Sequence, residues 1–177
     1  MGAECVAAPT APIIVAAVFG DADHAFLDGL RRAHFPPERN QLDAHLTMFH
    51  HLPPSLEDEL KARLAQIARA APPMARLASV INLGRGVALR VSSPELEAMR
   101  QEMAEAFAGA LTPQDANRWN PHVTIQNKAA PEAAKTLLRE MTERFQPRPL
   151  AIAGLAAYRY RGGPWEPILR YPFRGGR

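Results

Sequence analysis

Two segments of the sequence lie 77 residues apart and follow one pattern, which reads His, apolar, Thr, apolar. The first is His45-Leu46-Thr47-Met48 and the second is His122-Val123-Thr124-Ile125. Successive side chains of a β-strand point to opposite faces. Each segment, as a strand, would therefore turn its His and Thr to one side and its apolar residues to the other. Two such strands facing each other would bring two imidazoles and two hydroxyls into one cleft.

The order of elements expected around the two motifs also repeats along the chain. Hydrophobic periodicity and the Pro and Gly punctuation predict strand, helix, motif strand, helix, strand in the first half, and the same series from Val87 onward. Ser55 and Ser93 are the expected N-caps of the helices that they precede. We therefore predict an α+β fold of two duplicated lobes, with pseudo-repeats at about 12–83 and 87–160 and a terminal strand at 167–173. Each lobe would hold an antiparallel or mixed sheet with helices on its outer face, and a cleft would lie between the lobes.

The same patterns set the bounds of the predicted strands and helices. Strands are expected at 13–19, 42–49, 76–83, 87–91, 122–127, 150–160 and 167–173. Helices are expected at about 23–33 and after residues 55, 93 and 131.

Length and composition set the broad class of the protein. The 177 residues, 47% of them apolar and 22% charged, indicate one globular domain over residues 12–177 after a disordered Ala- and Pro-rich tail at 1–11. A single cysteine, Cys5, allows no disulfide framework and no cysteine-based zinc site. The apolar run at 13–19 is too short to span a membrane and lacks the basic flank of a signal peptide. We expect a cytoplasmic monomer, and the net charge of +3 suits an anionic substrate.

The paired motifs resemble the 2H phosphoesterase superfamily, which includes bacterial RNA 2′,3′-cyclic phosphodiesterases, also called the 2′-5′ RNA ligase family. That superfamily is defined by two His-x-Thr/Ser-x motifs about 80 residues apart, with apolar residues at x. The segment 158–165, Tyr-Arg-Tyr-Arg-Gly-Gly-Pro-Trp, is similar to the terminal hairpin of some bacterial branches. The resemblance covers about residues 12–173. It implies a bilobal duplicated fold and metal-independent, cofactor-free hydrolysis of 2′,3′-cyclic or 2′-5′-linked phosphodiesters of RNA or nucleotides, or the reverse ligation.

The chemistry gives a role to each motif residue. Opening a cyclic phosphate needs one group to take a proton from water and another to protonate the leaving ribose oxygen. Histidine titrates near neutral pH, so His45 and His122 are the candidate catalytic pair, with the acid and the base not yet distinguished. The hydroxyls of Thr47 and Thr124 are candidate substrate-binding groups that donate to the phosphate oxygens.

Other interpretations stay open at the level of sequence. The two histidines could be buried structural imidazoles. His50 and His51 follow the first motif but have no carboxylate or cysteine cluster beside them, so we expect no metal site. The protein could also be an RNA-end-binding module with weak or no catalysis, or a phosphoesterase of a small cyclic metabolite. Candidate phosphate or base contacts are four cations and four aromatic residues: Arg118, Lys128, Arg159, Arg161, Trp119, Tyr158, Tyr160 and Trp165.

Overall fold

The computed structural model describes residues 10–176, so almost all of the predicted disordered tail at 1–11 lies outside the described residues. The strands are β1 (Ile13–Phe19), β2 (Leu46–Leu52), β3 (Met74–Asn82), β4 (Val87–Ser92), β5 (His122–Gln126), β6 (Arg148–Arg159) and β7 (Glu166–Pro172). The helices are α1 (Asp21–His34), α2 (Glu57–Ile67), α3 (Pro94–Ala106), the short α4 (Pro113–Ala116) and α5 (Pro131–Arg144). Each predicted strand and helix has a counterpart among these elements.

The strands form one sheet of seven in the order β2-β1-β6-β3-β4-β5, with β7 paired to β6 outside this row. Every strand pairing within the described residues is antiparallel. The α+β class is confirmed, but the prediction of two sheets is wrong. The reason is the length of β6, whose 12 residues pair with β3 at the beginning and with β1 and β7 further along. One strand therefore joins what the sequence suggested were two sheets. The division of the chain into two repeats stays a prediction.

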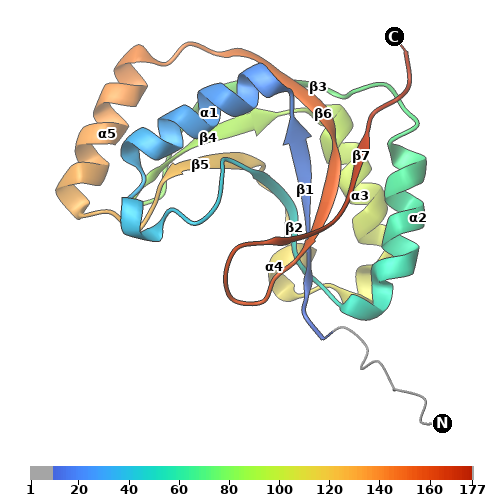
Figure 1. Ribbon diagram of the computed structural model, residues 1–177. Coiled ribbons are helices and arrows are strands. Elements are labelled where there is room, and N and C mark those ends of the chain that lie inside the picture. Colours follow the sequence, from blue (N-terminus) through green and yellow to red (C-terminus); the bar gives the residue numbers. More distant parts are fainter. Residues whose placement is uncertain (1–9, 177) are drawn as a thin grey trace.

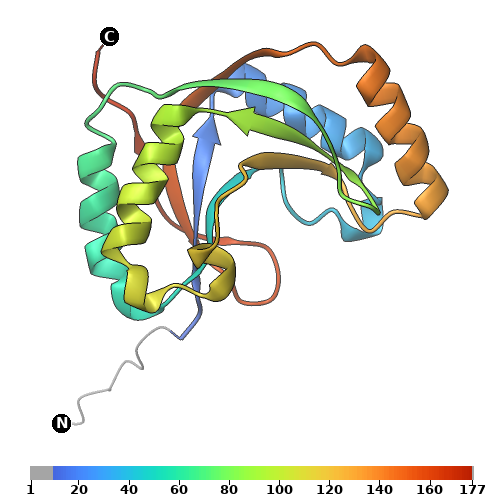
Figure 2. The same ribbon diagram turned by 180° about the vertical axis from the view of Figure 1, so that it is seen from behind.

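The sheet bends so that its two end strands, β2 and β5, contact each other without forming a strand pair. Helices α1 and α5 lie together over β3, β4 and β5, whereas α2 and α3 lie side by side at the other end of the molecule (Figures 1 and 2). The two strands that carry the motifs are thus brought together by the curvature of the sheet. No helix in residues 10–176 has both the length and the apolar character needed to cross a membrane.

The two motif strands share their local structure as well as their sequence. In each motif the two apolar residues are fully buried, whereas His and Thr are half-buried, which confirms the expected alternation. In each strand the register with its neighbour then shifts by one residue just after the Thr, between Thr47 and Phe49 in β2 and between Thr124 and Gln126 in β5. Such a bulge bends a strand and redirects the side chains that follow it, and bulges are common beside active sites.

The structure confirms one of the two predicted helix N-caps, Ser93, and contradicts the other, Ser55. Ser93 caps α3 as predicted, because its Oγ accepts a hydrogen bond from the backbone N–H of Leu96. Ser55 does not cap α2, because Pro54–Leu56 first form a 3₁₀ turn and the helix begins only at Glu57.

This difference predicts a pair of stability effects. Ser93→Ala is expected to lower the free energy of unfolding by about 1–3 kcal/mol, because it removes the N-cap and also the hydrogen bond that Ser93 Oγ donates to the carbonyl of Met74 at 2.7 Å. Ser55→Ala, which removes the same atoms from a position with no cap, is expected to leave it unchanged. Urea denaturation of the two variants measures both effects, and equal losses would contradict this assignment of the helix starts.

Candidate active site

The four motif residues line one cavity of about 390 Å³. His45 and Thr47 reach it from the start of β2, and His122 and Thr124 reach it from β5. The structure therefore brings together all four predicted site residues, although the two motifs lie 77 positions apart in the sequence. Neither threonine hydroxyl has a hydrogen-bond partner within the part of the chain that the structure describes, so both are available to a ligand.

The two imidazoles are held by matching hydrogen bonds. Nδ1 of His45 lies 2.7 Å from the backbone carbonyl of Asp43, and Nδ1 of His122 lies 2.7 Å from that of Asn120. A carbonyl oxygen can only accept, so Nδ1 carries the proton in each ring. The neutral form of each histidine therefore leaves the lone pair on Nε2, the nitrogen opposite the anchored one, which sets the tautomer needed to take a proton from a ligand.

The electrostatic surroundings of His45 favour its neutral form. Burial is the main cause, and it lowers the pKa of His45 from 6.5 to about 4. The hydrogen bond to the carbonyl of Asp43 opposes this shift, and the positive charge of Arg31 adds to it. His45 is therefore uncharged at neutral pH.

Three side-chain donors, two of them buried arginines, fix the backbone of both motif strands. The Trp119 indole donates to the carbonyl of Thr47 at 3.0 Å, and Arg100 donates to the carbonyl of Met48 at 3.2 Å. Arg31, only 4% exposed, donates from α1 to the carbonyl of Thr124 at 3.0 Å.

Arg31 also donates to the carbonyl of Leu42, just before the first motif. This explains why β2 begins at Leu46 rather than near residue 42 as predicted: the preceding residues bond to α1 instead of to a strand.

His50 is a cavity residue that the sequence did not reveal as part of this site. An undisturbed strand would alternate strictly and turn His50 away from the side of His45 and Thr47. The bulge after Thr47 reverses the alternation, and His50 lines the same cavity. A buried Asp115 orients it, since Nδ1 of His50 lies 3.1 Å from the carboxylate.

Asp115 also accepts hydrogen bonds from the backbone N–H groups of His50 and His51. Burial alone would raise the pKa of this carboxyl, but the hydrogen bonds from His50 and His51 hold it below the ordinary value of 3.8. Asp115 and His50 are 65 residues apart in the sequence and meet only because α4 packs against β2. No local sequence pattern therefore indicates that Asp115 orients His50. Within residues 10–176 no three His, Cys, Asp or Glu side chains are grouped so that they could hold a metal ion.

The four cations predicted as phosphate contacts lie in different parts of the structure. Arg118 is exposed, lines the cavity of the motifs and has no ion-pair partner within residues 10–176. Arg159 instead pairs with Glu57, and Arg161 with Glu166. Lys128 is exposed in the turn after β5 and does not line the cavity. Of these four cations, only Arg118 both lines the cavity and has no ion-pair partner within residues 10–176.

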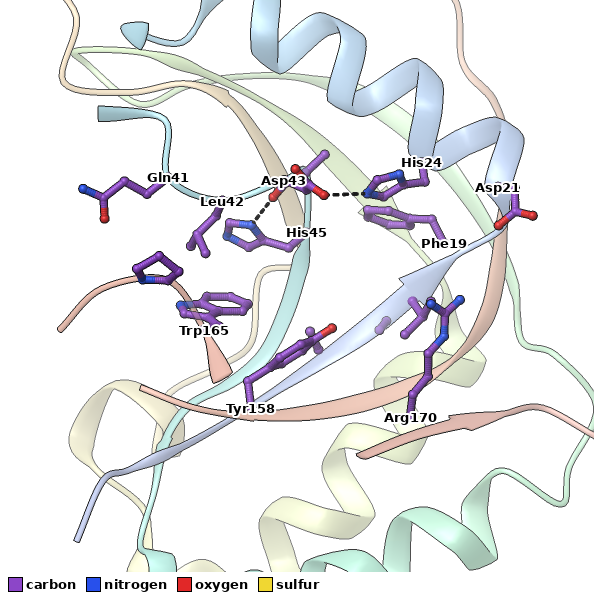
Figure 3. Close-up of a pocket in the computed structure, with 15 residues that line it drawn as sticks. Phe19, Asp21, His24, Gln41, Leu42, Asp43, His45, Tyr158, Trp165 and Arg170 are labelled. Atoms are coloured by element: carbon purple, nitrogen blue, oxygen red, sulfur yellow. Dashed lines mark hydrogen bonds and ion pairs between the residues drawn. The ribbon is translucent and has the colours of Figure 1, made fainter. Parts of the chain in front are cut away.

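Of the predicted aromatic contacts, Trp119 and Trp165 line the cavity of the motifs, and Tyr160 is exposed. Trp165 packs on the ring of His45, with the ring centroids 4.6 Å apart, and Tyr158 packs on Trp165 at 5.4 Å. Beyond His45 and Trp165 a second cavity of about 490 Å³ opens, for which these two side chains form the shared wall (Figure 3).

Comparison with protein families matches the sequence to one known group. The model of the 2′-5′ RNA ligase superfamily matches residues 19–164 and so includes both motifs. A search of the curated proteins finds no significant match.

Solved structures share the fold. The TT0787 protein of Thermus thermophilus is 20% identical, with a TM-score of 0.62, over 94% of this chain and 100% of that one. A phosphoesterase matches with 19% identity and a TM-score of 0.62 over 93% and 99% of the two chains. E. coli LigT, in complex with NADP⁺, matches with 18% identity and a TM-score of 0.62 over 94% and 99%.

Proposed function

The chain belongs to the 2′-5′ RNA ligase superfamily, and from this premise we propose that it is a metal-independent phosphodiesterase. Its proposed substrates are RNA ends or nucleotides with a 2′,3′-cyclic phosphate or a 2′-5′ linkage. The reverse of cleaving a 2′-5′ linkage to a cyclic phosphate and a 5′-hydroxyl would be 2′-5′ ligation. The observation that carries the proposal is the meeting of His45, Thr47, His122 and Thr124 in one cavity, with both imidazoles anchored through Nδ1.

The proposed reaction is a displacement at phosphorus. Nε2 of one neutral histidine takes a proton from water as the water oxygen bonds to the phosphorus. The bond from phosphorus to one ribose oxygen breaks, and the other histidine, in its protonated form, gives its proton to that oxygen. The cyclic diester becomes a monoester beside a free hydroxyl, and one water is consumed. Acid and base help of this kind contributes about 10²–10⁴-fold for each group.

The low pKa of His45 favours it as the base for hydrolysis, and His122 then acts as the acid. The unpartnered hydroxyls of Thr47 and Thr124 would donate to the non-bridging phosphate oxygens, where negative charge grows in the transition state. Arg118 would attract the phosphate from the rim of the same cavity. In ligation a 5′-hydroxyl takes the place of the water and the two histidines keep their roles, whereas they exchange roles when a 2′-5′ bond is cleaved back to a cyclic phosphate.

Nucleotide-sized ligands fit this proposal. LigT of E. coli has been crystallised with NADP⁺ and with 3′-AMP, the latter structure matching this chain with a TM-score of 0.57. The proposed substrate class combines a phosphate, a ribose and a base, as those ligands do.

The assignment of the base predicts a pH dependence. His45 must be neutral to accept a proton, so kcat/KM, which reports the free enzyme, is expected to fall as the pH drops through about 4. A bound phosphate would stabilise the charged imidazole, so the acidic limb of kcat is expected at a higher pH than that of kcat/KM. Initial rates across the acidic range measure both limbs, with circular dichroism as the control that the protein stays folded. An acidic limb of kcat/KM near the ordinary pKa of histidine would overturn His45 as the buried base.

A substrate panel tests the proposed function itself. Nucleoside 2′,3′-cyclic phosphates, 2′-5′ dinucleotides and an RNA ending in a cyclic phosphate are incubated with the protein in EDTA. We expect turnover of at least one of the three and no loss of rate from the chelator. Binding of the RNA without turnover of any substrate would instead favour an RNA-end-binding module.

A further inference from the structure

The second cavity lies directly beside the site of the motifs. It runs from the shared wall of His45 and Trp165 along β1 and the start of α1, toward β6 and β7. Its volume of about 490 Å³ falls within the usual range for small-ligand pockets. A ligand held there would be next to the phosphate at His45.

The walls of this cavity differ in chemistry. Figure 3 shows Trp165, Tyr158 and Arg170 along one side, and Gln41, Asp43 and His24 along the other. The Tyr158 and Trp165 rings, which pack on each other, offer the apolar faces on which a base can stack. The opposite side supplies hydrogen-bond acceptors and an amide that suit a base edge or ribose hydroxyls.

Arg170 provides the only arginine or lysine side chain among the residues that line this cavity. It is exposed on β7, and it has no hydrogen-bond or ion-pair partner within residues 10–176. It lies close enough to Tyr158 for its charge to oppose the effect of burial, which raises the pKa of that phenol. One free guanidinium is suited to one phosphodiester group rather than to a polyphosphate.

We propose that the second cavity binds a nucleotide that is joined by a phosphodiester to the reacting one, with its base on Tyr158 and Trp165 and its phosphate at Arg170. This inference rests on the proposed function, because it places the cyclic phosphate between His45 and His122. The preferred substrate is then an RNA end of at least two nucleotides rather than a single nucleoside cyclic phosphate. Arg170 is a specificity-determining residue and takes no part in the proton transfers.

The test compares a nucleoside 2′,3′-cyclic phosphate with a dinucleotide that ends in a 2′,3′-cyclic phosphate. The wild-type protein is expected to have the higher kcat/KM for the dinucleotide. Arg170→Ala is expected to lower that kcat/KM about tenfold, the size of a lost charge-assisted hydrogen bond, and to leave the mononucleotide rate unchanged. Arg139→Ala, which removes the same charge from an exposed site on α5, is the matched control and should change neither rate.

Two outcomes separate this inference from the proposed function. Turnover of both substrates with equal kcat/KM, or an equal effect of Arg170→Ala on both, would overturn the second subsite alone. Absence of turnover would overturn the proposed function. In that case calorimetric binding of a dinucleotide 3′-phosphate still tests the subsite: weaker binding by Arg170→Ala than by Arg139→Ala supports it, and equal binding contradicts it.

Discussion

His122→Ala and His45→Ala are each expected to lower kcat for the opening of a 2′,3′-cyclic phosphate about 10²–10⁴-fold, the usual contribution of one acid or base. Each substitution removes the only imidazole that its motif contributes to the cavity, and neither removes buried apolar surface from the core. The rates are measured with a nucleoside 2′,3′-cyclic phosphate at saturating concentration.

His51→Ala is the matched control for these two variants. His51 is exposed on β2 and lines neither cavity, and its hydrogen bond to Asp115 is made by its backbone N–H. We expect its rate to equal that of the wild type. Thermal unfolding followed by circular dichroism shows whether the inactive variants are folded. Full activity of a folded His45→Ala or His122→Ala would remove that residue from the proposed mechanism.

Asp115→Ala is expected to have the largest effect on stability, lowering the free energy of unfolding by about 2–5 kcal/mol. Its carboxylate is 1% exposed and accepts hydrogen bonds from two backbone N–H groups and from the ring of His50. Alanine would leave these three donors without their acceptor. Urea denaturation gives the loss, and Glu143→Ala, an exposed carboxylate on α5, should show almost none. An Asp115→Ala variant as stable as the wild type would contradict the role of this contact.

The contribution of Asp115 to the free energy of unfolding also depends on pH and is lost in acid. Because the folded state holds the pKa of this carboxyl below its ordinary value of 3.8, the carboxylate stabilises the fold fully above that value. The stabilisation disappears as the pH falls through the lower pKa of the folded state. The difference in unfolding free energy between wild type and Asp115→Asn should therefore shrink in that acidic window.

The sequence predicted most of the elements and all four motif residues of the cavity because the relevant signals are local. Alternation of His, apolar, Thr and apolar residues specifies a strand with one polar side, and the Ser93-Pro94 pair specifies a helix start. The spacing of the motifs then suggested that both strands reach one cleft, as they do.

The features that the sequence did not predict depend on pairing between distant segments. A single sheet exists because β6 pairs with β3 at its beginning and with β1 further along, and no local signal in the sequence specifies these pairing partners. His50 reaches the cavity only because the register of β2 against β1 shifts after Thr47. Asp115 orients His50 from α4, 65 residues away along the chain.

The most direct test of the central claim follows one phosphorus atom. An RNA with a 2′,3′-cyclic phosphate end is incubated in EDTA with the wild-type protein and with a His45→Ala, His122→Ala double variant, and phosphorus NMR records the product. We predict that the wild type converts the cyclic diester to a monoester and that the folded double variant leaves it intact. A cyclic phosphate that survives the wild-type protein, or that the double variant opens equally fast, would contradict the two-histidine site.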